Sequence, residues 1–493
     1  MAAETTVARA GGPEAVRLRK GQLSLPNCIA LSAALLAPVI AVILNAPAAA
    51  PNSGAALPLS FLGAFIATGF VANSVIQFTR RLPSSGSFYT FCSHGLGSAA
   101  GFFTGWMYFF AFVMFAIGLF TANGSFLHNY LQTELSIDIP WWILGLALIG
   151  LVFGLSIRSI KASVRVDLAL LGFEMFFFLL LGIIAIAKAG DGNTLHYFTP
   201  GASGDGIKGV ALGGVFGILS FVGFESAAVL GEETRNARRN IPRAVFGAMV
   251  IIGVFYVVMM YALTAGYHLN DPAQLKAFLN DPTPFPTLAN RYASWLKQII
   301  DIAAVFGLFS CFLAVQNATV RVLYAMGRDR VLPPQLGRIH DSWRSPFVAI
   351  FALTGLSIVA GLLLSAWLGN GITDVYGWTG SLGTVAVIIV YILANVALIR
   401  FFRSDPERSV WKHVVAPALG VVALAYPLYY VAKPGQAGHY NLVPYIVLIW
   451  IVLGFVAYYV LRARSPEKLQ AMGRVLAEEE DDLGEAHLTS APV

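Results

Sequence analysis

Residues 213–226 read GGVFGILSFVGFES and place an ionisable side chain, Glu225, inside a long apolar stretch. A charge at the centre of a bilayer costs about 2.5–3.5 kcal/mol on insertion scales, so an ionisable residue there normally faces a cavity or a partner and marks a functional site. The alternative is that Glu225 stays protonated, or is hydrogen-bonded within the bundle, and only ties helices together. Both interpretations place this stretch in a membrane.

The composition of the whole chain supports a membrane location. Of its 493 residues, 57% are hydrophobic and 12% are charged, whereas about 25% are charged in a soluble globular domain. A soluble protein with so little polar surface would expose large apolar patches, which excludes a large soluble enzyme. Because Cys28, Cys92 and Cys311 stand far apart, the sequence predicts neither a disulfide framework nor a metal site.

Twelve stretches are long and apolar enough to cross a bilayer as helices, which takes about 20 residues each. The sequence therefore predicts an all-α integral membrane protein with twelve transmembrane helices. The stretches are residues 23–46, 56–78, 98–127, 139–157, 163–187, 208–231, 243–267, 297–325, 346–368, 373–401, 411–432 and 441–462.

The positive charges test this count independently, because Lys and Arg concentrate in cytoplasmic loops. With the N-terminus inside, all but six of the 32 Lys and Arg residues fall in cytoplasmic segments; the six are Lys188, Lys208, Lys276, Arg291, Lys297 and Lys433. Adding or removing one span would destroy this alternation, so both termini are expected in the cytoplasm. The net charge of +6 follows from the same rule and implies no nucleic-acid partner.

Two of the twelve spans contain residues that interrupt a helix. In the sixth span, Gly209, Gly213 and Gly217 form a packing stripe, and an interruption is expected near residues 220–223. In the first span, Pro38 removes a backbone N–H and clashes with the preceding turn. Interrupted first and sixth helices are the expected trace of two inverted five-helix repeats with a binding site between them. The alternative is an ordinary proline kink and a packing glycine.

A second acid, Glu174, lies within the apolar sequence of the fifth span. It either binds a cation or relays a proton, or it makes a structural hydrogen bond, and the sequence favours neither. Metal-binding HExxH spacing, a phosphate loop and a nucleophile elbow are all absent, so no enzymatic activity and no cofactor are predicted.

Three separated motifs follow spans two, six and eight. The chain reads RLPSSGSFY at 81–89 and FVGFE at 221–225, the latter followed by GEETRN at 231–236 and NIPR at 240–243. It then reads RVLYAMGRD at 321–329, followed by Leu332-Pro333 and Ser345-Pro346. These motifs resemble the signatures of the amino acid–polyamine–organocation (APC) superfamily of permeases, and the match spans most of residues 25–400.

The resemblance implies a LeuT-like, five-plus-five inverted repeat with discontinuous helices 1 and 6 and two additional C-terminal spans. It also implies transport of amino acids or related amines by alternating access, with the substrate's carboxylate and amino groups bound to unwound backbone. By position, the substrate-binding residues are Ala37, Pro38, Val39, Ile40, Ser220, Phe221, Val222 and Gly223. Phe221 or Phe224 is the candidate aromatic lid, and Glu225 and Glu174 are the candidate gating or coupling groups.

The chain departs from the family pattern at the break in span one. Ala37-Pro38-Val39-Ile40 stands where many members have a Gly-Ser-Gly type sequence, and Pro38 leaves fewer N–H donors for a carboxylate. A polyamine or ethanolamine-like cation, attracted by Glu174 and Glu225, is therefore an alternative substrate. Arg330, where the family often has glycine, is a second departure in a cytoplasmic loop.

The predicted organisation follows from these observations. Residues 1–22 form a cytoplasmic arm, 23–187 the first repeat, 208–401 the second repeat, 411–462 the last two spans and 463–493 a cytoplasmic tail. The expected function is secondary active transport across the plasma (inner) membrane, by proton-coupled symport or exchange and without ATP. Sodium coupling would need ligands between spans one and eight, where Ser310 and Thr319 are available. A membrane solute sensor without flux is the competing class, and nothing in the sequence sets an oligomeric state.

Overall fold

The computed structural model describes residues 24–82, 87–158, 160–229, 234–281, 283–328, 332–340, 342–343, 345–369, 371–436 and 438–464. The expected N-terminal arm and nearly all of the C-terminal tail lie outside these ranges. So do Arg330 and the motif residues 83–86, 231–233 and 329–331.

The described part of the chain is built from helices and contains no strand. The α-helices are α1 (Leu25–Leu35), α2 (Pro38–Ile40), α3 (Ala46–Ser53), α4 (Leu57–Arg81), α5 (Ser87–Leu96), α6 (Ser98–Leu135), α7 (Trp141–Arg158), α8 (Ile160–Lys188), α9 (Gly206–Phe221), α10 (Ser226–Val229), α11 (Ala237–Tyr267), α12 (Pro272–Leu279), α13 (Pro284–Tyr292), α14 (Lys297–Arg328), α15 (Phe347–Leu368), α16 (Gly377–Phe401), α17 (Ala416–Ala432) and α18 (Val443–Arg464). Three π-helical segments, η1 (Ala41–Asn45), η8 (Gly371–Tyr376) and η9 (Trp411–Val415), lead into α3, α16 and α17.

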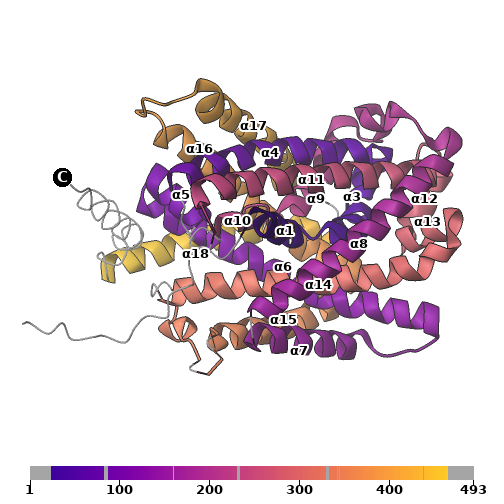
Figure 1. Ribbon diagram of the computed structural model, residues 1–493, viewed down its shortest axis with the longest axis horizontal. Helices are drawn as coiled ribbons and strands as arrows, with labels where there is room; N and C mark the ends of the chain where they lie inside the picture. Colours follow the sequence, from indigo (N-terminus) through magenta and orange to yellow (C-terminus); the bar gives the residue numbers. More distant parts are fainter. Residues whose placement is uncertain are drawn as a thin grey trace, which may run out of the picture.

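The long helices lie side by side along the long axis of the molecule, with α12 and α13 at one end (Figure 1). Within the described ranges, nine helical stretches are long and apolar enough to cross a membrane, and α9 and most of α7 are shorter apolar helices. A helix occupies each of the twelve stretches expected from the sequence. The protein is therefore a multi-pass, all-helical membrane protein, while the count of twelve spans and the inverted repeat remain predictions.

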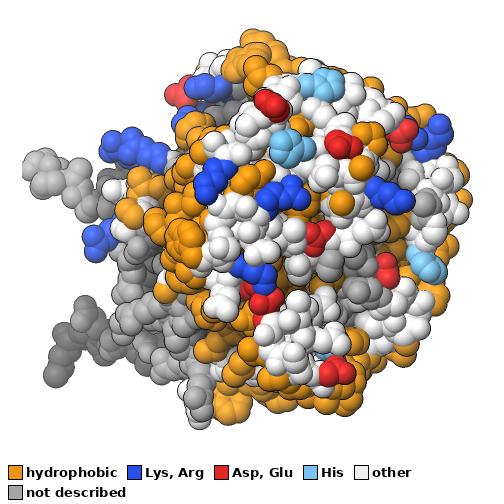
Figure 2. Space-filling view, turned by 90° about the vertical axis from the view of Figure 1, so that its right-hand side faces the viewer, with side chains coloured by type: hydrophobic (Ala, Val, Ile, Leu, Met, Phe, Trp, Pro, Cys, Tyr) orange, Lys and Arg blue, Asp and Glu red, His pale blue; other side chains and the backbone are white. Residues whose placement is uncertain are grey.

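The outer flanks of the bundle are apolar. Large hydrophobic side chains are exposed along α15 and α18, including Leu363 at 66% and Ile449 at 59% exposure. Seen from the α12–α13 end, charged side chains of both signs lie on the end face and hydrophobic ones surround it (Figure 2). A water-soluble protein would not leave such a surface uncovered, whereas a bilayer covers it.

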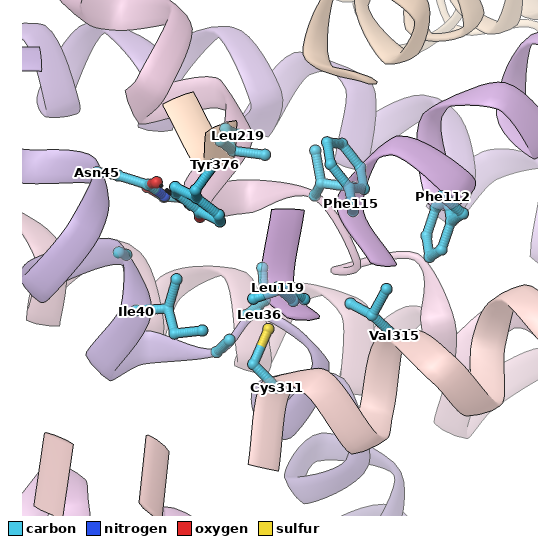
Figure 3. Close-up of a pocket in the computed structure, with 14 residues that line it drawn as sticks. Leu36, Ile40, Asn45, Phe112, Phe115, Leu119, Leu219, Cys311, Val315 and Tyr376 are labelled. Carbon is cyan, nitrogen blue, oxygen red and sulfur yellow. Dashed lines mark hydrogen bonds between the residues drawn. The ribbon is translucent and has the colours of Figure 1, made fainter. Parts of the chain in front are cut away.

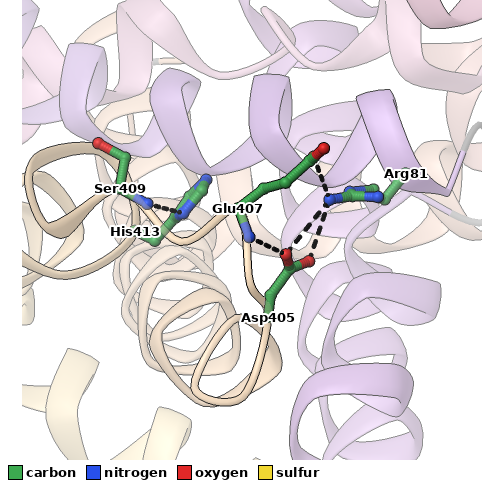
Figure 4. A network of polar contacts seen from close by, with 5 residues as sticks. All are labelled: Arg81, Asp405, Glu407, Ser409 and His413. Carbon is green, nitrogen blue, oxygen red and sulfur yellow. Dashed lines mark hydrogen bonds and ion pairs between the residues drawn. The ribbon is translucent and has the colours of Figure 1, made fainter.

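The opposite end of the bundle is held by a charged cluster between α4 and the loop after α16. The guanidinium of Arg81 lies 3.1 Å from Asp405 and 2.7 Å from Glu407 (Figure 4). Beyond this loop, in η9, the His413 ring stacks on Phe402 at 3.9 Å. The pairs with Arg81 are largely exposed, so each contributes little energy. They join the end of α4 to the loop after α16.

The first and sixth predicted spans are both broken. Helix α1 ends at Leu35, and Ala37 has a left-handed backbone with φ of 46° before α2 begins at Pro38. A proline is well suited to the first position of a helix, where its missing N–H costs nothing, so the break lies just before Pro38 rather than at it. Helix α9 ends at Phe221, followed by the extended Val222 and by Gly223 with φ of 109°.

The glycine stripe of α9 lies against α3 and α4, as a packing function requires. A Cβ at Gly217 would lie 2.7 Å from the Cβ of Ala64, and one at Gly213 would meet the side chain of Ser53. Only a glycine lets these helices approach so closely. This close packing accounts for the glycines in the half of the span before the break.

Two tryptophans join α18 to the rest of the bundle. The rings of Trp106 in α6 and Trp450 in α18 stack at 4.5 Å, and each indole N–H donates to the other residue's carbonyl oxygen, at 3.0 and 3.2 Å. We expect Trp450→Phe to lower the thermal unfolding midpoint in detergent, because it removes one bond worth about 1 kcal/mol. Trp450→Ala should lower the midpoint further by also removing the stacked ring.

The exposed Trp295 provides the control, since Trp295→Phe makes the same chemical change outside the bundle. Equal midpoints for Trp450→Phe, Trp295→Phe and the unchanged protein would show that the pair does not hold α18.

Candidate functional site

A cavity of about 50 Å³ lies where the two broken helices meet α6, α14 and η8 (Figure 3). Its walls come from segments far apart in the sequence, which only the folded bundle brings together. The lining residues are Leu36, Ala37, Ile40, Ala41, Asn45, Phe112, Phe115, Leu119, Leu219, Ser220, Val222, Cys311, Val315 and Tyr376.

One side of the cavity is polar. The Asn45 amide nitrogen donates to the Ser220 hydroxyl at 2.8 Å, and the Tyr376 hydroxyl donates to the Asn45 amide oxygen at 2.9 Å. Ser220 in turn donates to the carbonyl oxygen of Phe216 at 2.8 Å. All three side chains are buried, so this chain of bonds satisfies groups that would otherwise be costly in a dry interior.

A tyrosine outside the cavity links the two helix breaks. The Tyr256 hydroxyl on α11 lies 2.6 Å from the carbonyl oxygen of Leu36 and 2.9 Å from that of Ser220. Both carbonyls belong to helix ends, where no intrahelical N–H is available. One hydroxyl proton shared by two orphan acceptors therefore couples the position of the first break to that of the second.

The other side of the cavity is apolar. Phe112, Phe115 and Leu119 project from one face of α6, and Cys311 and Val315 from one face of α14. In Figure 3, Phe112 and Val315 lie across the cavity from Asn45 and Tyr376. The cavity thus offers hydrogen-bonding groups on one side and hydrocarbon on the other.

The eight residues predicted to bind substrate divide into two groups. Ala37, Ile40, Ser220 and Val222 line the cavity. Pro38, Val39, Phe221 and Gly223 are not among its lining residues.

The packing of Phe221 and Val39 explains why they point elsewhere. Phe221 stacks on Phe65 at 5.7 Å and meets Tyr256 edge-on at 5.1 Å. Val39 packs against Gly307 of α14, where an added Cβ would lie 2.8 Å from its own. The rings that do line the cavity are Phe112, Phe115 and Tyr376.

Glu225 lies beyond the cavity in a cage of hydroxyl and amide donors. Its carboxyl group accepts from the Tyr108 hydroxyl at 2.5 Å, the Tyr391 hydroxyl at 3.3 Å and the Gly223 amide at 3.2 Å. The side chain is 1% exposed, and Phe224 packs on Tyr391 at 5.7 Å. The carboxyl therefore ties the second half of the broken helix to α6 and α16.

The cage lies between the cavity and the Arg81 end of the molecule. Tyr108 is one turn before the cavity residue Phe112 along α6, and Tyr391 follows the cavity residue Tyr376 along α16. The end of α5, which leads into α6, lies against the end of α16, since a Cβ at Gly95 would lie 2.6 Å from the carbonyl oxygen of Ala397. By the predicted orientation this is the cytoplasmic side.

Glu174 is not among the residues that line the cavity. Its side chain is buried, and one of its carboxyl oxygens would lie 2.5 Å from a Cβ at Gly307. Glycine at 307 therefore makes room for both Glu174 and Val39 at the meeting of α2, α8 and α14. In the described ranges no three His, Cys, Asp or Glu side chains form a metal-binding group.

The two candidate sodium ligands are both buried in α14. The Thr319 hydroxyl donates within the helix to the carbonyl oxygen of Val315 at 2.7 Å. This bond leaves the threonine engaged in its own helix turn.

Several residues that shape the cavity were not predicted from the sequence. Asn45 is a polar residue in an apolar stretch, and that polarity is a signal that could have found it. Tyr256 and Cys311 carry no such signal, because tyrosine and cysteine are common in membrane helices. The apolar spans show no periodicity that distinguishes a cavity-facing side chain from a lipid-facing one.

A family model and several known relatives assign the chain to the same family. A family model described as amino acid permease matches residues 24–455. The branched-chain amino acid permease BcaP of Bacillus subtilis (strain 168) is 24% identical over 440 residues, covering 85% of this chain and 88% of the relative. The methylthioribose transporter of the same organism is 25% identical over 433 residues, with coverage of 85% and 88%.

A third relative transports a different class of compound. The low-affinity putrescine importer PlaP of Escherichia coli (strain K12) is 26% identical over 311 residues, covering 62% of this chain and 66% of the relative. Because the family model covers most of the chain and the relatives are permeases, the chain is not an enzyme. It belongs to the amino acid permease family of the APC superfamily.

Proposed function

We propose that the protein is a secondary active transporter that moves an amino acid or related amine across the plasma membrane by alternating access, as a proton-coupled symporter or an exchanger. Both termini are cytoplasmic in this proposal, and the two broken helices belong to inverted repeats of five. The observation that carries it is the cavity between the two breaks, tied together by Tyr256.

The breaks provide backbone groups that suit a zwitterion. The helical run that begins with α2 and continues through η1 and α3 starts next to Ala37. The positive end of its dipole favours a carboxylate although Pro38 offers no N–H, while the carbonyl ends of α1 and α9 favour an ammonium group. All three helix ends contribute residues or neighbours to the cavity wall. A substrate with both groups can therefore be desolvated there without a charged side chain in the wall.

The Glu225 cage is the proposed cytoplasmic gate. It joins the second half of the broken helix to α6 and α16 across the route from the cavity to the Arg81 end. Opening that route requires the bonds from Tyr108 and Tyr391 to break. Protonation of the carboxyl would weaken them as acceptor bonds, which links gate opening to proton binding.

The first prediction of this proposal concerns flux. Purified protein in proteoliposomes should take up at least one labelled amino acid or amine without ATP, driven by a proton gradient or by counter-substrate. Liposomes without protein are the control. Folded protein that moves no member of a full amino-acid and amine panel would contradict the proposal.

The second prediction concerns Glu225. Glu225→Gln keeps the shape of the side chain but removes its titration, so uptake should lose much of its dependence on pH. Tyr391→Phe should weaken the cage and leave that dependence in place, because the carboxyl remains. An unchanged pH profile for Glu225→Gln would remove this residue from the coupling mechanism.

The third prediction concerns Tyr256. Tyr256→Phe leaves two buried carbonyls without a donor, at a cost of about 1–3 kcal/mol, and should reduce uptake severalfold while the protein stays folded. Tyr261→Phe, on the same helix but away from the breaks, is the control. Equal uptake by the two variants would show that the shared hydroxyl does not couple the breaks.

A further inference from the structure

Resting on the proposed function, the wall of the cavity restricts the class of substrate. Among the described lining residues none is charged, and the polar side chains are Asn45, Ser220 and Tyr376. These three are already bonded to one another in a chain. Apart from the helix ends, which suit the carboxylate and ammonium groups of a zwitterion, the cavity therefore provides only hydrocarbon and one thiol.

The two acids near the site are not placed to hold a second ammonium group. Glu225 is enclosed by Tyr108, Tyr391 and the Gly223 amide. Glu174 does not line the cavity and lies against Gly307. A lysine side chain or the second amine of a diamine would have to shed its water without a counter-charge in the wall, which is unfavourable.

An acidic side chain would meet the same problem. No Lys or Arg belongs to the described wall of the cavity. A glutamate substrate would then bury its side-chain carboxylate against Phe112, Phe115 or Val315.

We propose that the substrate is an α-amino acid with an uncharged aliphatic side chain. Its carboxylate and ammonium groups lie at the two helix breaks, and its side chain lies against Phe112, Phe115, Leu119, Cys311 and Val315. These five residues set the specificity. The wall that these residues form is hydrocarbon with one thiol, which suits an aliphatic side chain.

Cys311 makes the proposal testable by a method other than transport. It lines the cavity at 7% exposure, whereas Cys28 and Cys92, the other two cysteines of the chain, are fully buried elsewhere. In a Cys28→Ser/Cys92→Ala variant, Cys311 is the only thiol. Its reaction with N-ethylmaleimide then reports occupation of the cavity.

The experiment measures labelling of this variant in proteoliposomes with valine, isoleucine, lysine, glutamate or putrescine, and uptake of each compound in parallel. We expect valine and isoleucine to slow labelling at least fivefold and to be taken up, and the three charged compounds to do neither. If putrescine or lysine is taken up, while valine and isoleucine neither protect Cys311 nor are taken up, the proposed substrate class is overturned. The proposed transport then remains intact. Protection by valine without flux of any compound would overturn transport and leave the binding class intact.

A substitution in the apolar wall tests the specificity residues. Phe115→Leu should shift the ratio of phenylalanine to valine uptake about tenfold toward phenylalanine, because small changes in an apolar pocket alter discrimination by about that much. Phe110→Leu is the matched control, since Phe110 is buried in α6 but does not line this cavity. An unchanged ratio in Phe115→Leu, with uptake retained, would overturn the assignment of the side-chain site to this wall.

Discussion

The structure depends on how a broken helix can exist inside a bilayer. Each break leaves carbonyl and amide groups without intrahelical partners, and lipid offers them none. The Tyr256 hydroxyl donates to the carbonyl oxygens of both Leu36 and Ser220 and so provides a partner at each break. Because one donor serves both breaks, neither half of the site can move without disturbing the other, and the cavity between them acquires a defined geometry.

The same constraint explains where the polar and charged groups lie. Asn45, Ser220 and Tyr376 satisfy one another at the cavity wall, so they add little charge to it. The carboxyl of Glu225 is kept in a separate cage one helical turn away. The ionisable group is therefore separate from the cavity wall. In the proposed mechanism this separation lets a proton act at the gate without entering the cavity.

The sequence predicted those features that depend on the backbone chemistry of particular residue types. Pro38 and Gly223 predict breaks because proline lacks an N–H and glycine tolerates a positive φ, and both breaks are present. The stripe at Gly213 and Gly217 likewise packs closely. The direction of side chains was not predictable, because spans such as α6 and α16 are apolar on every face. That is why the sequence could not show that Ala37, Ile40, Ser220 and Val222 line the cavity whereas Pro38, Val39, Phe221 and Gly223 do not.

The proposed binding mode assigns different parts of the substrate to different parts of the cavity. In this proposal the backbone of the two breaks recognises the carboxylate and ammonium groups common to all α-amino acids, whereas the wall from α6 and α14 meets the side chain, which differs among them. A change from one amino acid to another would then need only a few side chains of this wall to change, because neither Tyr256 nor the Glu225 cage belongs to the wall.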